Sequence, residues 1–194
     1  MLYANDEKRY FKDHYYSYYL GKYMIASLFK PAAIAEIGVR WGYSAFAFLC
    51  ASPGASYTGF DIPEGGSGGV KQNTFPRVRQ ILISNFAKAT VKLVRADTRR
   101  MTSLSEDDEY RTFFDFVHID GDHHEEAAYH DMQIGFERLI PGGTMLIDDN
   151  VSIAGVTRAC LRFLKDRHKE VERAIRLPSL TGELIIIKNG DSNA

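Results

Sequence analysis

Short apolar runs alternate with segments of helical period along most of the chain, and this alternation constrains the fold more than any other feature. Strands are expected at residues 33–38, 57–61, 91–96, 114–120 and 145–148. Helices are expected between them at residues 43–51, 76–87, 106–112 and 125–139. Most of the apolar runs are too hydrophobic for a sheet with one face in water, so helices should cover both faces. The pattern predicts an α/β fold with a doubly wound, mostly parallel sheet and right-handed crossovers.

The C-terminal part of the chain departs from this alternation. A helix is expected at residues 153–168, followed by strands at 172–177 and 183–188. The connection at 178–182 is short enough for an antiparallel hairpin at the sheet edge, which brings the sheet to seven strands. We expect one domain at residues 31–188, a helical segment at 1–30 before it and a disordered tail at 189–194.

Composition excludes several classes of protein. The chain has 194 residues, 45% of them apolar, and a net charge of −1, which is typical of a folded domain. It has no apolar run near the ~18 residues of a membrane span, and its first residues lack the apolar middle of a secretion signal. Cys50 and Cys160 both fall in apolar helical patterns, which predicts buried thiols in a reducing compartment, the cytoplasm.

Charge is distributed unevenly along the sequence. Residues 1–100 hold 14 Lys/Arg against 7 Asp/Glu, whereas residues 101–194 hold 10 against 18. The acidic second half disfavours a nucleic-acid partner, because phosphates bind clustered cations. A solvated helix face explains part of these acidic residues, and a bound cation is the alternative.

An acidic residue lies at or near the end of nearly every expected strand. These residues are Glu36, Asp61, Asp97, Asp120 and the pair Asp148–Asp149. In open α/β sheets, ligands bind beyond the carboxyl ends of the strands, where the strand order reverses. Helix N-caps are the ordinary explanation of acids at such places, but so regular a placement favours a binding site.

The first strand–helix turn runs from Glu36 to Ser44. Gly38 permits a tight turn, and Gly42 lets the backbone approach a ligand at the start of the helix. The turn lacks the complete glycine fingerprint of dinucleotide-binding proteins, which makes a nicotinamide oxidoreductase the least favoured class. Glu36 would serve an ammonium or sulfonium group better than a pyrophosphate.

Two further acids suit the rest of a nucleoside. Asp61 can accept hydrogen bonds from two ribose hydroxyls, and Asp97 is placed to meet an adenine amino group. A nucleoside that carries a cationic amino-acid tail therefore fits these residues best.

The acids after the fourth and fifth strands indicate a second ligand. Asp120, Asp148 and Asp149 should lie close together, because the two strands are expected to be neighbours. Three carboxylates at that spacing repel one another and raise one another's pKa values. A hard divalent ion such as Mg²⁺ resolves the conflict, and it would also orient an acceptor hydroxyl.

Several motifs occur together in one chain: the first turn at residues 36–44, Asp120-Gly121-Asp122-His123, Pro141-Gly142-Gly143 and Asp148-Asp149. With them, residues 31–188 resemble class I S-adenosylmethionine-dependent methyltransferases, most closely the macrocin O-methyltransferase type, which modifies sugar hydroxyls of natural products. The resemblance implies a Rossmann-like seven-stranded sheet. It also implies cofactor contacts and a metal beside strands four and five. The cofactor residues would be Glu36, Gly38, Gly42, Ser44, Asp61, Asp97 and Asp120, the last shared with the metal.

Two assignments stay open within this resemblance. The macrocin-type pattern places Asp148 and Asp149 on the metal with Asp120, and we favour it. The catechol type uses an Asp-Asn pair, which matches Asp149-Asn150 equally well. The general base that takes the acceptor proton is either Asp122 or His123, and Asp122 is alternatively a cap of the following helix.

The expected function is metal-assisted O-methylation of a small-molecule hydroxyl. The alternatives are an inactive nucleoside-binding module of the same fold and a metal-dependent hydroxylase or hydrolase. The aromatic residues of the N-terminal segment would line an acceptor pocket or, more simply, pack in the core or in a contact between subunits of a homo-oligomer. Residues 63–74 are either a partial lid or an ordinary loop.

Overall fold

The computed structural model describes residues 13–62, 74–104, 113–178 and 181–190. A single sheet of seven strands has the order β3-β2-β1-β4-β5-β7-β6. The strands are β1 Ala33–Ile37, β2 Ser56–Asp61, β3 Thr90–Arg95, β4 Phe114–Ile119, β5 Leu139–Ile147, β6 Val171–Leu177 and β7 Glu183–Lys188. Strands β1 to β5 are parallel, and β7 is antiparallel to both β5 and β6. The predicted fold, with its C-terminal hairpin, is confirmed.

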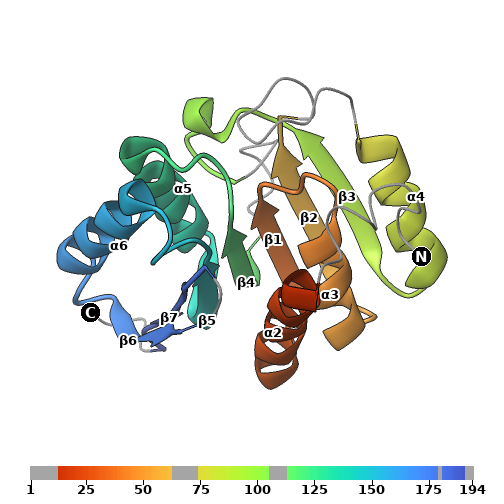
Figure 1. Cartoon of the computed structure of the whole chain (residues 1–194), viewed down its shortest axis with the longest axis horizontal. Helices are drawn as coiled ribbons and strands as arrows, with labels where there is room; N and C mark the ends of the chain where they lie inside the picture. The colour runs from red at the N-terminus through yellow and green to blue at the C-terminus, as the bar shows by residue number, and fades with distance from the viewer. Residues whose placement is uncertain (1–12, 63–73, 105–112, 179–180, 191–194) are drawn as a thin grey trace.

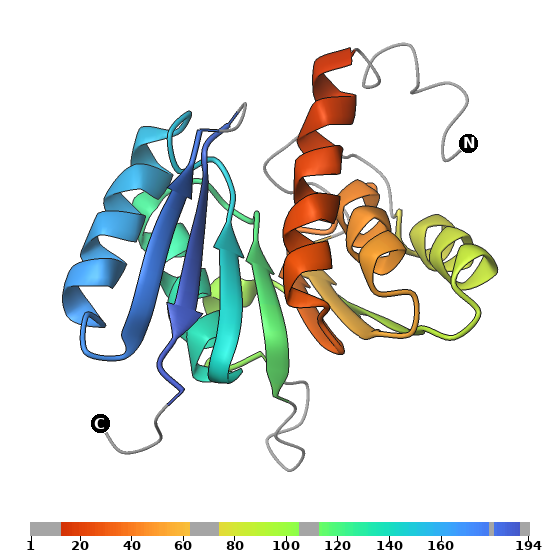
Figure 2. The same ribbon diagram turned by 90° about the horizontal axis from the view of Figure 1, so that it is seen from below.

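Helices cover both faces of the sheet, as the hydrophobic strands require (Figure 1). They are α2 Asp13–Phe29, α3 Tyr43–Ala51, α4 Phe75–Asn85, α5 Glu125–Glu137 and α6 Ala154–Asp166, with a short 3₁₀ helix at Thr98–Arg100. Helices α5 and α6 lie on one face, and α2, α3 and α4 lie on the other (Figure 2). None of the helices in the described ranges is long and apolar enough to cross a membrane.

The core consists of two apolar layers separated by the sheet. Along β4, Phe116 packs on the α2–α3 side, while Val117 packs on the α5–α6 side. Residues Met145 and Leu146 of β5 divide in the same way. Successive side chains of a strand point to opposite faces, so continuous apolar runs are what a sheet buried on both sides needs.

Strand order reverses between β1 and β4, which are adjacent in the sheet but far apart in the sequence. The connections from β1 and from β4 leave on opposite faces, and this divergence opens a crevice at their carboxyl ends. Glu36 and Asp120 therefore come from the two strands that border the crevice.

Some boundaries differ from those expected. The residues Pro141-Gly142-Gly143 do follow a helix end, but they lie inside β5 rather than before it. The pairing of β4 with β5 is irregular between Phe114 and Phe116, so this stretch is accommodated as a distortion of the strand. The expectation of two buried thiols is wrong for Cys50, which lies on the exposed side of α3; Cys160 is buried.

Other expectations fall outside the described residues. These are the helix expected at 106–112, the loop at 63–73 and the last four residues of the tail. The N-terminal helix begins at Asp13 in the described part of the chain and packs against α3.

Candidate active site

The β1–α3 turn is held tightly against the end of β4. Gly38 has a φ of 92°, and a Cβ at this position would lie 1.9 Å from the carbonyl oxygen of Asp120. Gly42 has a φ of 74° and precedes the first residue of α3. Both glycines are thus required by backbone geometry, and Gly38 is what lets the first turn approach Asp120.

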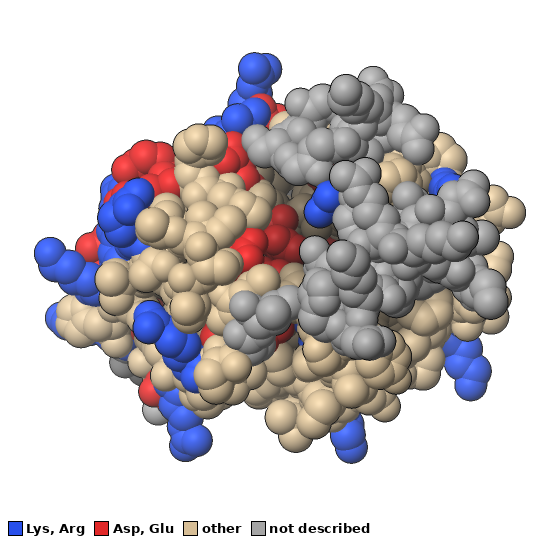
Figure 3. All heavy atoms as spheres, in the orientation of Figure 1, with Lys and Arg blue, Asp and Glu red and all other residues tan. Residues whose placement is uncertain are grey.

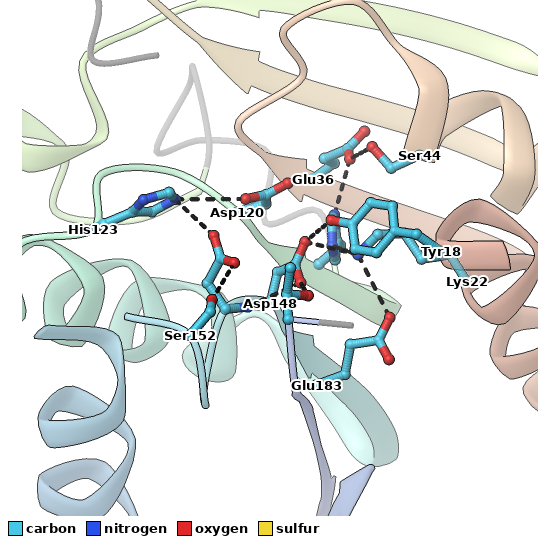
Figure 4. Close-up of polar contacts among 12 residues, drawn as sticks. Tyr18, Lys22, Glu36, Ser44, Asp120, His123, Asp148, Ser152 and Glu183 are labelled. Atoms are coloured by element: carbon cyan, nitrogen blue, oxygen red, sulfur yellow. Dashed lines mark hydrogen bonds and ion pairs between the residues drawn. The ribbon is translucent and has the colours of Figure 1, made fainter. Parts of the chain in front are cut away.

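Glu36 is completely buried beneath this turn. Its carboxylate accepts a hydrogen bond from the hydroxyl of Ser44, and Nδ1 of His118 lies 2.9 Å from its Oε1 atom (Figure 4). The hydroxyl of Tyr57 donates to its Oε2 atom. Burial and the neighbouring Glu36 carboxylate raise the pKa of Tyr57 well above its ordinary value. Tyr57 therefore acts as a donor, and Glu36 is fixed by three groups from α3, β2 and β4.

Asp61 and Asp97 lie at or just beyond the ends of β2 and β3, as predicted. The carboxylate of each accepts hydrogen bonds from a neighbouring residue. The backbone N–H of Arg40 donates to Asp61 Oδ2 over 2.6 Å. Burial raises the pKa of Asp61. Arg99 donates to both oxygens of Asp97, with Nε 2.7 Å and Nη2 2.9 Å away, and lowers its pKa.

Asp120, His123 and Asp149 come together at the carboxyl ends of β4 and β5. His123 Nε2 lies 3.2 Å from Asp149 Oδ2 and 3.8 Å from Asp120 Oδ1 (Figure 4). Ser152 Oγ donates to Asp149 Oδ1 over 2.8 Å. Burial, and then the charge of Asp148, raises the pKa of Asp120 to about 6. The nearby Asp120 carboxylate raises the pKa of His123, despite the partial burial of the ring.

Asp148 has a different environment from Asp149. Its Oδ1 atom accepts from the backbone N–H of Asp149 over 2.9 Å and from Thr181 Oγ1 over 2.8 Å. Its Oδ2 atom accepts from Lys22 Nζ over 3.0 Å and from the hydroxyl of Tyr18. Burial alone would raise the pKa of Asp148, but Lys22 and the other donors outweigh it and hold the pKa well below its usual range. Asp148 is therefore the buried partner of a lysine.

Asn150 adds an observation that bears on a metal. Its side chain is fully buried, and neither its amide oxygen nor its nitrogen has a hydrogen-bond partner among the described residues. Such a group is costly unless a ligand completes it. Oxygen and nitrogen atoms of Asp120, His123 and Asp149 lie within 4.8 Å of one another. The carboxylates of Asp120 and Asp149 fit a divalent cation, which prefers oxygen ligands.

A second cluster suitable for a metal comprises His118, Asp120 and Asp148. In this cluster His118 Nε2 and Asp148 Oδ2 both contact the Lys22 ammonium, at 3.1 and 3.0 Å. A positive charge already occupies that space, so the cluster built on Asp149 is the better metal site.

Asp122 points away from this pair of acids toward Arg99 and His124. It accepts from the backbone N–H of His124 over 3.0 Å, its Oδ1 lies 2.6 Å from Nδ1 of the same residue, and Arg99 Nη1 is 3.4 Å from its Oδ2. Partial burial opposes these contacts, but together they lower the pKa of Asp122. A carboxylate held in its charged form is a weak proton acceptor, and its contacts are those of a residue that shapes the turn before α5.

The sequence did not single out Lys22, His118 or Thr181, and it indicated only pocket-lining or packing roles for the N-terminal aromatic residues, among them Tyr18, which donates to Asp148. The one signal was that Lys22 is the only lysine or arginine in the 17-residue helix α2, which is otherwise rich in aromatic and apolar residues. Nothing local to that helix indicates that its partner lies 126 residues further along the chain.

The sequence model of a family described as "Methyltransferase domain" matches residues 35–150. This match covers more than half of the chain and includes Glu36, Asp120 and Asp149, so the chain belongs to this methyltransferase family. No curated protein matches it significantly.

Solved structures agree with the fold. The chain is similar to CalS11, a TDP-rhamnose 3'-O-methyltransferase of calicheamicin biosynthesis, with 20% identity, a TM-score of 0.66 and coverage of 96% of this chain and 85% of that one. It is also similar to the methyltransferase PaMTH1 of Podospora anserina bound to S-adenosylhomocysteine (17%, TM-score 0.64, coverage 89% and 78%). A third is the O-methyltransferase TomG of Streptomyces achromogenes with S-adenosylmethionine (13%, TM-score 0.61, coverage 90% and 80%). The family match therefore identifies a methyltransferase domain, and the chain shares its fold with methyltransferases whose structures contain S-adenosylmethionine or S-adenosylhomocysteine.

Proposed function

We propose that the protein transfers a methyl group from S-adenosylmethionine to a hydroxyl of a small molecule, with a divalent cation at Asp120 and Asp149. The observation that carries this proposal is the position of His123. Its Nε2 atom faces carboxylates from two neighbouring strands, at the edge of the crevice where β1 and β4 diverge. A base, two acids and a nucleoside site at one edge suit deprotonation and methyl transfer.

On the cofactor side, the proposal assigns the nucleoside and its amino-acid tail to residues of the first three strands. The Glu36 carboxylate has four positions at which it can accept a hydrogen bond, and three of them are used by Ser44, Tyr57 and His118. The fourth position is available for the cofactor's ammonium. Asp61 would bind the ribose hydroxyls and Asp97 the adenine amino group. Gly38, Gly42 and Ser44 shape the turn that faces the tail.

On the metal side, we propose Asp120, Asp149 and Asn150 as ligands, in place of the expected pair Asp148–Asp149. Both oxygens of Asp148 already accept two hydrogen bonds each, whereas the Asn150 amide has none. When bound, a divalent cation supplies positive charge that lowers the pKa of an acceptor hydroxyl.

For the base, we propose His123 rather than Asp122. The acceptor O–H bond breaks as its proton moves to His123 Nε2, and the oxygen attacks the methyl carbon. The carbon–sulfur bond breaks at the same time, and S-adenosylhomocysteine leaves with the electron pair on sulfur. Negative oxygen and positive sulfur are neutralised together, so the protein contributes mainly by aligning the two reactants.

The acceptor is proposed to be a sugar or a natural product, as the likeness to the macrocin type implies. CalS11 acts on a TDP-sugar and TomG serves tomaymycin synthesis, which supports this class. Figure 3 shows acidic side chains in a hollow near the centre of one face, a surface that would repel a nucleic-acid backbone. A cytoplasmic location remains a prediction.

The test combines binding and turnover. Calorimetry should detect S-adenosylmethionine binding, and labelled cofactor should transfer methyl to a hydroxyl acceptor in Mg²⁺. Asp120→Asn should lose at least about 100-fold in turnover while the cofactor Kd changes by less than about fivefold. Asp166→Asn, an exposed acid on α6, is the matched control.

Different failures would eliminate different parts of this proposal. Full activity in a chelator would remove the metal. Cofactor binding without turnover on any hydroxyl would favour an inactive module, and absence of cofactor binding would favour a metal-dependent hydroxylase or hydrolase.

A further inference from the structure

Lys22 places a positive charge in the interior of the molecule. The side chain projects from α2, is completely buried, and lies 3.0 Å from Asp148 Oδ2, 3.1 Å from His118 Nε2 and 3.8 Å from Glu183 Oε1. Burial acts to lower the pKa of Lys22, but the surrounding acids Asp148, Asp120 and Glu183 outweigh it and raise the pKa. The amine is therefore a charged ammonium with three donors and three neighbours.

The ammonium determines how His118 bonds. An ammonium has donors only, so Nε2 of His118 accepts its hydrogen bond. The proton of the neutral ring is then on Nδ1, which donates to Glu36 Oε1 over 2.9 Å. The imidazole is fully buried, and the ring of Phe48 lies edge-on to it at 5.0 Å, which leaves the ring one orientation.

A continuous chain of hydrogen bonds thus runs from α2 to the residue proposed to hold the cofactor's ammonium. It passes from Lys22 through His118 to Glu36, across the strands β4 and β1 (Figure 4). The same ammonium holds Asp148, the residue next to the proposed metal ligand Asp149. A buried ion pair would need only the contact between Lys22 and Asp148, without the hydrogen bond from Lys22 to His118.

We propose that Lys22 is a positioning residue that couples the docking of α2 to the cofactor site through His118 and Glu36. This inference rests on the proposed function in one respect, the contact of Glu36 with the cofactor. The coupling is reciprocal: seating α2 orders Glu36 for the cofactor, and the bound cofactor in turn stabilises the docked helix.

The experiment measures hydrogen exchange in α2 together with the affinity for S-adenosylhomocysteine, the product form of the cofactor. In the wild-type protein, product binding should slow amide exchange in α2. In Lys22→Met, affinity should fall about tenfold, the effect of one lost hydrogen bond to a charged group, and the slowing of exchange in α2 should disappear.

Two further variants separate coupling from stability. Ile25→Val removes one methylene from a buried α2 residue of the apolar layer, so it should speed exchange in α2 yet keep the response to product. Lys22→Met leaves Asp148 without its buried partner and risks unfolding. The double variant Lys22→Met with Asp148→Asn removes both charges, and it should fold and show the same loss of coupling.

The outcomes are distinct. Affinity within twofold of wild type, or an undiminished response of α2 to product, in either folded Lys22 variant would overturn the proposal. Loss of the response in Ile25→Val as well would also overturn it, because any loosening of the helix would then suffice. A wild-type protein that binds the product but transfers no methyl would refute the proposed function and leave the coupling standing.

Discussion

His123 differs in its surroundings from His118, His124 and His130, three of the other histidines among the described residues. His118 is buried between Lys22 and Glu36. Nε2 of His130 lies 3.0 and 2.9 Å from two carbonyl oxygens, and the ring of His124 is largely exposed. His123 alone among these lies half-exposed between two acids from different strands. A base needs such access to solvent and substrate, and the neighbouring acids stabilise the protonated ring that forms.

His123→Gln should lower kcat/KM by about 100- to 10,000-fold, the usual contribution of a general base. His124→Gln, one residue further along, is the control and should remain within about twofold because its ring faces solvent. Initial rates with saturating cofactor check both. If Asp122→Asn loses activity and His123→Gln keeps it, the roles of the two candidates are reversed.

Asp131 illustrates a residue whose burial has a measurable cost. It lies on α5, is 1% exposed, and its Oδ1 atom has no partner among the described residues. Burial raises its pKa to about 6. Because the folded-state pKa exceeds that of the unfolded chain, Asp131 favours folding below pH ~4, and that contribution is lost as pH rises through about 6.

Asp131→Asn should therefore raise the free energy of unfolding by about 1–3 kcal/mol near pH 7 and by little near pH 4. Urea unfolding of wild type and variant at the two pH values checks the difference. An equal effect at both would mean that the change acts through packing rather than through the charge.

At the level of elements, the β1–α3 turn shows how a strand end becomes a binding edge. Its close approach to Asp120 depends on one position without a side chain. Gly38→Ala should prevent folding or cost several kcal/mol, because Cβ would lie 1.9 Å from a backbone oxygen that cannot move independently. Gly142→Ala is the matched control: its φ is 76°, but the space around it is open, so only the strain of about 1–2 kcal/mol remains. Equal losses in urea unfolding would refute this explanation.

The elements themselves were well predicted, for an identifiable reason. Helix α3 begins and ends where the pattern indicated, and the strands agree to within a residue or two except β5. That strand begins six residues before its expected start, because Pro141-Gly142-Gly143 is a typical stop signal for the preceding helix and was assigned to the helix end. Pairing with the neighbouring strands places these residues in β5. The local sequence contains no information about that pairing.

At the scale of the whole molecule, the outer side of α2 carries a row of exposed apolar side chains. Tyr16, Leu20, Met24 and Leu28 recur every four residues, and their exposed fractions are 65%, 41%, 58% and 80%. A row of this kind with no charged side chain favours a contact between two copies of the chain.

Sedimentation should show a dimer that Met24→Glu with Leu28→Glu converts to monomer. Leu161→Glu, an equally exposed apolar residue on α6, should leave the dimer intact. A wild-type protein that sediments as a monomer at micromolar concentration would contradict the expected homo-oligomer.

Local sequence determined the layers and the edge at which the site lies. Periodicity selected strands and helices, and the parallel order placed Glu36, Asp61, Asp120 and Asp149 at the same ends of their strands. Only the tertiary structure distinguished Asp148 from Asp149. The distinction depends on Lys22 and Tyr18, which lie 126 and 130 residues away in the sequence. Side-chain pairing over such separations depends on where a helix docks, and no local pattern of residues encodes that position.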